Sequence, residues 1–435
     1  MKTILTIAFA SALCASAFAD PQITSWFTTD SGQFAQIYRT DADKFSGRAE
    51  TIWSNGRQNQ WQPAFNGVQE ILSSANWVYI RSTGLGSQVM GPWYVDPQRR
   101  ILFPNLPTNQ HFIIAIPRHP AAETGRHFNH LGEIGLFVDG VQMFDASDSF
   151  SYSNQNGRDA DPRARIGRGD GLWNRDAFVN EGITFDAGFG HQQQWGTYHY
   201  HAEPIALRYL LGDHVDFDSA SKSYGESAGA PVKHSPILGW MDDGYPVYGP
   251  YGYSDPNNPN SGVRRMVSGF VLRDGENGTD NLAETGRRTL PAWDARDLSR
   301  SIVLQDYETG PDVNGRYPLG HYLEDYAYLG DLGNTRGKDF DLDESNGRWG
   351  VTPEFPQGTY AYFTTIDASG RPAYPYVMGH RFHGNPVGRI VRGVYESVTT
   401  NFINQANTAL VSAPAAKTTT LTWNAGNGNY DAASR

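Results

Sequence analysis

The stretch that most constrains this chain is residues 195–201, Trp-Gly-Thr-Tyr-His-Tyr-His, in which two histidines alternate with two tyrosines. Successive side chains of a β-strand point to opposite faces. A strand here therefore places His199 and His201 on one face and Tyr198 and Tyr200 on the other. Imidazoles two residues apart on a strand lie close enough to bind one metal ion together. The pattern predicts a strand with a metal-binding or active-site face.

Two more histidines, His191 and His234, flank this stretch, so the predicted metal site has three or four imidazole ligands. Cu(II) and Zn(II) both favour neutral imidazole, and a site with three histidines leaves one position for water or substrate. The predicted cofactor is therefore a transition metal, copper or zinc. Copper is preferred, because the site is expected outside the cytoplasm and tyrosines flank the histidine pair.

Side chains around the ligands complete the predicted site. Metal-bound histidines commonly donate their second ring N–H to a carboxylate, which fixes the orientation of the imidazole. Asp186, Asp242 and Asp243 are the candidates for such carboxylates, and Tyr198 and Tyr200 are the candidate phenols beside the ligands.

The first residues predict the compartment. Residues 1–19 contain Lys2, a short apolar run and Ala17-Phe-Ala19, which is typical of a cleaved secretory signal. The single cysteine, Cys14, lies in this segment, so thiolate ligands are not expected in the processed protein. We expect a secreted or periplasmic protein. Its formal net charge of −11 argues against nucleic acid as a partner, and no later run is long and apolar enough to span a membrane.

The fold class follows from composition and turn signals. Abundant Gly, Tyr, Trp and Phe with little charge predict a mainly β fold, a sandwich-like or mixed β module with long loops and few short helices. Asp139-Gly140 and Asp243-Gly244 each lie between apolar runs and predict two β-hairpins. Residues 358–363 repeat the alternation of residues 196–201 without histidines, which hints at an internal repeat whose second copy lacks the ligands.

The predicted organisation has four parts. They are a signal peptide (1–19), an N-terminal β region packed on or part of the main module (20–130), the main module (131–385), and a C-terminal tail or linker (386–435).

An ordered set of motifs resembles a known family. The set comprises Gly190-His191, residues 198–201, His234-Ser-Pro, residues 243–250, residues 343–348, residues 352–362 and residues 374–376. It is similar to the YHYH-domain proteins, an exported and mostly bacterial family. The resemblance covers residues from about 60 to 385, and it implies secretion and one continuous module. It implies little about chemistry.

Three functions remain open from the sequence. The favoured one is a secreted metal-binding protein, with a copper-type redox enzyme as its extension. The second is a carbohydrate- or envelope-binding β protein with structural histidines, in which aromatics such as Trp195, Trp240 and Tyr245 form a platform for a glycan. The third is a zinc-type hydrolase.

A serine nucleophile at Ser227 is disfavoured, because its G-x-S-x-G motif follows a polar stretch and precedes Pro231. Whether the protein is an enzyme, its small-molecule or glycan partner, and its oligomeric state are not specified by the sequence.

Overall fold

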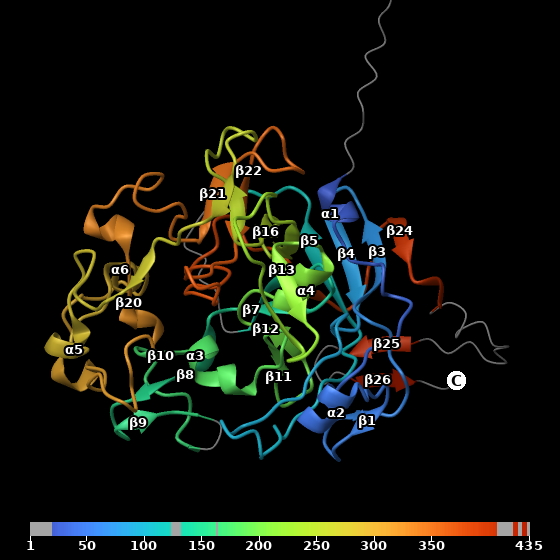
Figure 1. Ribbon diagram of the computed structural model, residues 1–435, viewed down its shortest axis with the longest axis horizontal. Coiled ribbons are helices and arrows are strands. Elements are labelled where there is room, and N and C mark those ends of the chain that lie inside the picture. The colour runs from blue at the N-terminus through green and yellow to red at the C-terminus, as the bar shows by residue number, and fades with distance from the viewer. Residues whose placement is uncertain (1–19, 123–131, 162–163, 407–420, 425–428, 433–435) are drawn as a thin grey trace, which may run out of the picture.

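The computed structural model describes residues 20–122, 132–161, 164–406, 421–424 and 429–432. The predicted signal peptide, residues 1–19, lies outside the described residues. Within them, many short strands form several sheets and the helices are few and short, which confirms the mainly β fold class (Figure 1). A search of this part of the chain finds no helix with the length and apolar character needed to cross a membrane.

An eight-stranded sheet organises the molecule, with strand order β11-β12-β7-β6-β15-β16-β22-β21. Its strands are β6 (Glu133–Phe137), β7 (Gln142–Phe144), β11 (Gly190–Gln192), β12 (Tyr198–Tyr200), β15 (Ile237–Met241), β16 (Pro246–Tyr248), β21 (Gly347–Gly350) and β22 (Thr359–Phe363). The two predicted hairpins are β6–β7 and β15–β16. Each turns at its Asp-Gly pair, where Gly140 and Gly244 adopt the positive φ that such turns require.

This sheet consists of two halves with the same topology. We call β6, β7, β11 and β12 the first half, and β15, β16, β21 and β22 the second half. In each half a strand pairs in parallel with the second strand of the hairpin and antiparallel with an outer strand. The register shift in the β6–β7 hairpin recurs at the equivalent place in the β15–β16 hairpin. The structure therefore contains the internal repeat at which the sequence hinted.

The two halves meet at β6 and β15, which pair antiparallel around a local two-fold axis. Gly135 lies opposite Met241, and the equivalent Gly239 lies opposite Phe137. A side chain at Gly135 would come within 2.4 Å of the Trp240 carbonyl oxygen, and one at Gly239 within 2.7 Å of a carbonyl oxygen of β6. Glycine at both positions lets the central strands approach each other.

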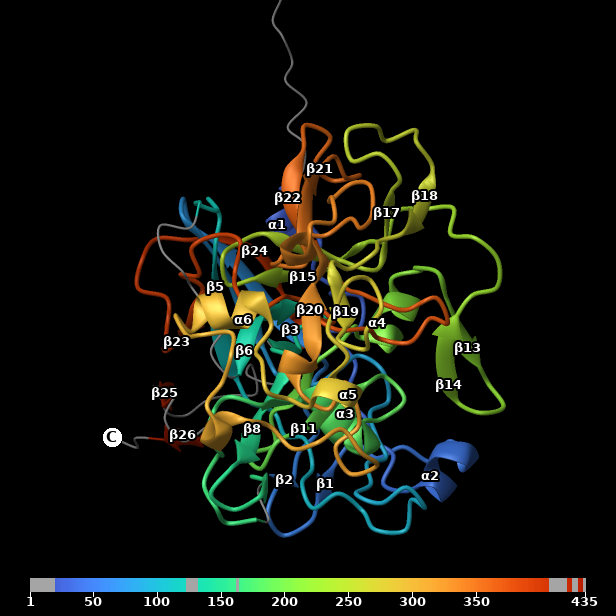
Figure 2. The same ribbon diagram turned by 90° about the vertical axis from the view of Figure 1, so that its left-hand side faces the viewer.

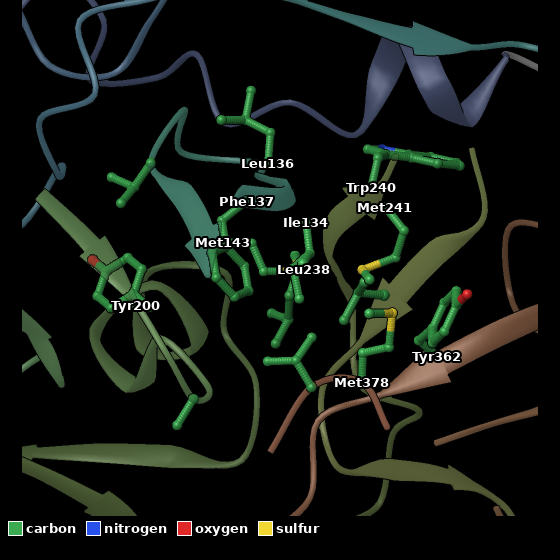
Figure 3. Packing of buried hydrophobic residues seen from close by; sticks show 14 of the residues in the cluster. Ile134, Leu136, Phe137, Met143, Tyr200, Leu238, Trp240, Met241, Tyr362 and Met378 are labelled. Carbon is green, nitrogen blue, oxygen red and sulfur yellow. The ribbon is translucent and has the colours of Figure 1, made fainter. Parts of the chain in front are cut away.

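The main hydrophobic core lies around this axis and takes side chains from both halves. Figure 3 shows Ile134 from β6 close to Leu238 from β15, and Leu136, Trp240 and Tyr362 belong to the same cluster. All five are buried. The same cluster includes buried side chains of the N-terminal region, such as Val68, Ile80 and Ile114.

A five-stranded sheet, order β23-β5-β4-β3-β24, lies beside the eight-stranded sheet and at the right in Figure 1. Its strands are β3 (Val68–Ser73), β4 (Trp77–Ser82), β5 (Phe112–Pro117), β23 (Arg389–Val391) and β24 (Thr399–Ile403). The stretch predicted as a tail or linker therefore begins with two strands that form both edges of the N-terminal sheet. Backbone pairing holds residues 389–391 and 399–403 at the edges of this sheet.

The remaining elements are short and lie around these two sheets, and Figure 2 shows the β13–β14 hairpin projecting from the body. The strands are β1 (Trp53–Ser54), β2 (Asn59–Gln60), β8 (Ser147–Ser153), β9 (Arg158–Asp159), β10 (Asn174–Asp176), β13 (Val215–Asp218), β14 (Ser223–Glu226), β17 (Tyr251–Tyr253), β18 (Val263–Arg265), β19 (Phe270–Leu272), β20 (Tyr326–Tyr328), β25 (Leu421–Asn424) and β26 (Asn429–Ala432). The α-helices are α1 (Pro21–Thr24), α2 (Asp41–Ser46), α3 (Ala177–Glu181), α4 (Ile205–Leu210), α5 (Leu282–Thr285) and α6 (Ala292–Asp297). The 3-10 helices are η1 (Gly182–Thr184), η2 (Asp306–Glu308), η3 (Leu323–Asp325) and η4 (Leu329–Leu332).

Candidate metal centre

The outer hairpin of the first half, β11–β12, brings three histidines together on one face. His191 lies directly opposite His199 in the antiparallel register, and His201 follows two residues later on the same face. Their side chains are 3–4% exposed. Tyr198 and Tyr200 point to the opposite face, where both are fully buried. The predicted alternation is present in the structure.

The Nε2 atoms of the three imidazoles converge on one point. His199 Nε2 lies 3.1 Å from the Nε2 atom of His191 and 3.1 Å from that of His201. All three ligand atoms lie within 4.8 Å of one another. Two nitrogens that bind one tetrahedral ion at roughly 2.0–2.1 Å stand about 3.3 Å apart, so the observed spacing suits a shared metal.

Hydrogen bonds at the second ring nitrogens fix two of the tautomers. His199 Nδ1 lies 3.0 Å from the Thr197 carbonyl oxygen, and His201 Nδ1 lies 2.6 Å from the Asp145 carbonyl oxygen. A carbonyl oxygen only accepts, so each Nδ1 carries the hydrogen. In the neutral rings, both Nε2 atoms are therefore lone-pair acceptors.

The same assignment holds for the third ring. His191 Nδ1 lies 2.7 Å from the Thr184 hydroxyl oxygen, and that hydroxyl donates its own hydrogen to the Glu181 carbonyl oxygen at 2.7 Å. The hydroxyl must therefore accept from His191 Nδ1–H. When all three rings are neutral, three bare Nε2 lone pairs face one another in a buried space, and imidazoles in this state are ready to bind a metal.

Aromatic rings enclose the imidazoles and burial sets their protonation. Phe144 stacks on His199 with ring centroids 4.0 Å apart, and Phe185 lies edge-on to His191 at 4.7 Å. Burial, followed by the neighbouring imidazoles, holds the pKa values of His191 and His199 well below the ordinary range. Burial also disfavours the charged form of His201, but the Glu181 carboxylate outweighs it and the pKa of His201 is raised.

Glu181 is the acidic side chain beside this cluster, and the sequence did not single it out. Its Oε2 atom lies 3.4 Å from His201 Nε2 and 3.6 Å from His191 Nε2, and its side chain is 28% exposed. Asp176 caps the short helix α3 by accepting the backbone N–H of Val179, which positions Glu181 at the end of the helix. The cluster therefore meets solvent on the Glu181 side.

Asp186 was predicted to orient an imidazole, and the structure places its carboxylate among the tyrosines instead. It accepts a hydrogen bond from the Tyr198 hydroxyl at 2.8 Å and from the backbone N–H of Gly190 at 3.2 Å. The Gln88 amide donates to both Tyr198 and Tyr200. Asp186, Tyr198 and Tyr200 thus hold the hairpin from the face opposite the histidines, because the side chains of a strand alternate.

Asp242 and Asp243 lie in the second half, where they do not orient any histidine of the cluster. Asp243 accepts hydrogen bonds from the Tyr362 hydroxyl at 2.6 Å and the Gly384 backbone N–H at 2.9 Å. Asp242 interacts with the Glu133 carboxyl across the two central strands. Both belong to the β15–β16 turn, which explains their separation from β11–β12.

The structure does not bring His234 into the cluster. Its ring lies between Tyr248 and Tyr253, with centroids 4.9 Å from each, and its Nδ1 atom contacts the Ser235 carbonyl oxygen at 2.8 Å. His234 precedes β15 and so belongs to the second half. The group that can hold a metal among the described residues is therefore three histidines rather than four.

Ser227 has no nucleophile elbow around it. It follows β14, a strand of a small exposed hairpin, and residues 227–236 contain no helix. The neighbouring Glu226 forms an ion pair with the buried Arg208. The buried strand and the following helix that a serine hydrolase needs are missing around Ser227.

A comparison with protein-family models confirms the family resemblance predicted from the motifs. The model of a family described as YHYH protein matches residues 113–375, which is more than half of the chain and contains every residue of the histidine cluster. Neither the curated proteins nor the solved structures contain a match to this chain.

Proposed function

The chain belongs to the YHYH protein family, and from the geometry of its histidine cluster we propose that it is a metal-binding protein. The ion is held by the Nε2 atoms of His191, His199 and His201. The observation that carries this proposal is the convergence of three Nε2 lone pairs whose partner Nδ1 hydrogens are all engaged.

The physical argument concerns the lone pairs. Two neutral acceptor nitrogens 3.1 Å apart repel each other, and burial removes the water that would otherwise separate and solvate them. A cation at the common point converts this repulsion into coordination. All three Nδ1–H groups donate a hydrogen bond to an oxygen, which matches the way proteins orient histidine ligands to a metal.

The donor set narrows the identity of the ion. Neutral imidazoles suit Cu(II) and Zn(II), and the only cysteine of the chain, Cys14, lies outside the described residues. We prefer copper, because residues 1–19 read as an export signal and the protein would then act outside the cytoplasm. If the ion is copper, we propose a redox activity for the site. If the ion is zinc, the alternative is a hydrolase.

The role of Glu181 determines whether the metal site is closed by protein ligands or keeps an open position. Structural sites fill all four positions with protein ligands, whereas catalytic sites keep one for water or substrate. The Glu181 carboxylate is placed to become the fourth ligand or to hydrogen-bond a molecule bound there. Any substrate would approach from this side, because the three imidazoles are otherwise buried.

Elemental analysis tests the proposal. The purified full-length protein, loaded separately with Cu(II) and Zn(II) and then desalted, should retain about one equivalent of ion per chain. The double variant His199→Ala/His201→Ala should retain none, because one remaining imidazole cannot hold an ion against dilution. Parallel loading shows which metal is bound more tightly.

His234→Ala is the matched control, since His234 is a buried histidine outside the cluster. It should keep its metal in full. Retention of metal by the double variant, or no retention by the wild-type protein with either ion, would refute the proposal. Circular dichroism of each variant separates loss of ligands from loss of fold.

A further inference from the structure

A second site lies in the other half of the molecule. A pocket of about 290 Å³ opens where α1, the end of β5, the β15–β16 turn and strands β21 and β22 meet. Four aromatic side chains line it, namely Trp240, Tyr245, Trp349 and Phe355. Its volume is just below the range of typical small-molecule sites, roughly 300–1,000 Å³.

Trp349 is the exposed element of this pocket. Its neighbours on β21, Arg348 and Gly350, are buried, but Trp349 points outward and is 60% exposed. The indole lies close to the backbone of Gly358, where a side chain would come within 3.1 Å of its Nε1 atom. A large apolar ring exposed at the mouth of a pocket is suited to contact with a ligand.

The inner aromatic wall is fixed by its own contacts. The Trp240 indole N–H donates to the Ser25 hydroxyl at 2.9 Å, and its ring packs edge-on against Phe355. Tyr245 packs edge-on against Tyr360, with centroids 5.4 Å apart. The wall is therefore formed before a ligand arrives, which reduces the entropy lost on binding.

Polar groups complete the rim without giving it a net charge. Asp20 and Arg118 form an ion pair, and Arg118 also donates to the Ser74 carbonyl oxygen. The Gln22 amide is fixed by the carbonyl oxygens of Pro117 and Gly244. The rim therefore offers one carboxylate, one guanidinium and one neutral amide. The charges of the carboxylate and the guanidinium cancel, so the rim favours a neutral ligand with many hydroxyl groups.

The first half shows that the pocket is not a by-product of the fold. The register position of Trp349 is occupied there by Gln192, which is buried and donates to the Asn105 carbonyl oxygen at 2.5 Å. The nearby Gly196 carbonyl accepts the Thr108 backbone N–H. A segment of the chain thus covers this edge in the first half, whereas the second half has an aromatic pocket at the same edge.

We propose that this pocket binds a neutral carbohydrate of one or two pyranose rings, with one ring stacked on Trp349. The aromatic rings contact the apolar C–H face of the sugar, and the Asp20–Arg118 pair hydrogen-bonds its hydroxyl groups. This site is separate from the histidine cluster and does not depend on a bound metal.

Titration calorimetry and tryptophan fluorescence test the proposal, with cellobiose, maltose and N,N′-diacetylchitobiose as probes. At least one disaccharide should bind with a millimolar or lower Kd. Trp349→Ala should weaken that binding about tenfold or more, as expected for loss of a central aromatic contact, and Trp349→Phe should restore part of it. Binding should be unchanged by a chelator and by His199→Ala/His201→Ala.

Trp195→Ala is the matched control, since Trp195 is 72% exposed and does not line the pocket. It should bind the sugar as the wild-type protein does. The proposal is overturned if none of the three disaccharides binds at 10 mM, a concentration about tenfold above a millimolar Kd. It is also overturned if Trp349→Ala and Trp195→Ala have equal effects, or if the pocket takes an aromatic probe such as indole and no sugar.

Discussion

The two halves of the central sheet share one set of contacts on the tyrosine face of their outer hairpins. In the first half the Tyr198 hydroxyl donates to the Asp186 carboxylate at 2.8 Å. In the second half the Tyr360 hydroxyl donates to the Asp343 carboxylate, also at 2.8 Å. Both carboxylates also accept the backbone N–H four residues later, each at 3.2 Å.

The turns that carry these aspartates are the same as well. A side chain at Gly190 would lie 2.2 Å from the Tyr198 hydroxyl oxygen, and one at Gly347 would lie 2.3 Å from that of Tyr360. The residues before the two glycines, Phe189 and Asn346, both have a positive φ, 69° and 65°. Such agreement in a strained turn indicates a common requirement of the fold.

The opposite face differs between the halves. The strand registers show which residues of the second half occupy the positions of the three histidines. They are Arg348, Ala361 and Phe363, in the places of His191, His199 and His201. Arg348 is 7% exposed and donates to the Tyr253 carbonyl oxygen at 2.6 Å. A buried guanidinium therefore supplies a permanent positive charge where the first half has an imidazole. The comparison teaches that the tyrosines of the YHYH motif serve the fold, and that the histidines are free to serve a function.

The largest expected effect comes from removing the two equivalent aspartates. Asp186→Ala should lower the free energy of unfolding by about 3–5 kcal/mol, because it leaves a tyrosine hydroxyl and backbone N–H groups buried without their charged partner. Asp343→Ala should lower it by about 1–3 kcal/mol, because the Asp343 side chain is 22% exposed and water can reach part of the site it leaves. Urea unfolding measures both. Asp343→Ala should still bind metal, whereas Asp186→Ala should lose it. If Asp343→Ala also abolishes metal binding in folded protein, the halves do not have separate roles.

Metal removal should also affect the two halves differently. An ion present at a thousand times its Kd stabilises the protein by about 4 kcal/mol, so a chelator should lower Tm. Hydrogen exchange should then increase in residues 190–201 and stay constant in residues 347–363, which carry no ligand. Equal increases in both hairpins would contradict the assignment of the metal to the first half.

Local patterns in the sequence were sufficient for the strand at residues 198–200, the Asp-Gly hairpins and the repeat, because alternation and turn chemistry act over a few residues. Three of the four predicted ligands converge for the same reason. Glu181 was missed, since a single glutamate at the end of a five-residue helix has no pattern of its own. His234 was predicted as a ligand because it lies near the other histidines in the sequence. In the structure it belongs to the second half of the sheet, away from the cluster. The strand order of the sheet therefore decides where His234 lies, because this residue leads into β15.

The turn aspartates of the two central hairpins should respond differently to replacement by asparagine. Burial raises the pKa of Asp139 to about 7 and that of Asp243 to about 6. Asp139 Oδ2 is buried without a hydrogen-bond partner, whereas Asp243 Oδ2 accepts from Tyr362. A carboxyl with a raised folded pKa contributes stability that is complete below its unfolded pKa of about 4 and lost as the pH rises through the folded pKa.

Asp139→Asn should therefore stabilise the protein at pH 8 by about 1–2 kcal/mol and change little at pH 5, because the buried charge is removed. Asp243→Asn should destabilise it at both pH values, since one of its two oxygens, each an acceptor in the wild-type protein, becomes an N–H₂ group. Urea unfolding at the two pH values measures both variants. Destabilisation of both at pH 8 would mean that the two turns are equivalent.

The smallest expected effect concerns charge balance at the cluster. In the second half Arg348 provides the positive charge, but in the first half the proposed cation comes from solution and the Glu181 carboxylate lies beside it. Glu181→Gln keeps the shape and removes this charge, so metal affinity should fall by about tenfold, at the lower end of the range for groups next to the ligands. Competition with a chelator of known affinity measures the change.

Glu276→Gln is the control for this last experiment, because it removes the same charge from an exposed loop distant in sequence from the cluster. Its metal affinity should equal that of the wild-type protein. Equal loss of affinity in both variants would assign the effect to the net charge of the chain. An unchanged affinity in Glu181→Gln would mean that the three imidazoles alone determine binding, so that the fourth position is available to water or substrate. Loss confined to Glu181→Gln would place its carboxylate at the ion, and the open position required for catalysis would then depend on displacing that side chain.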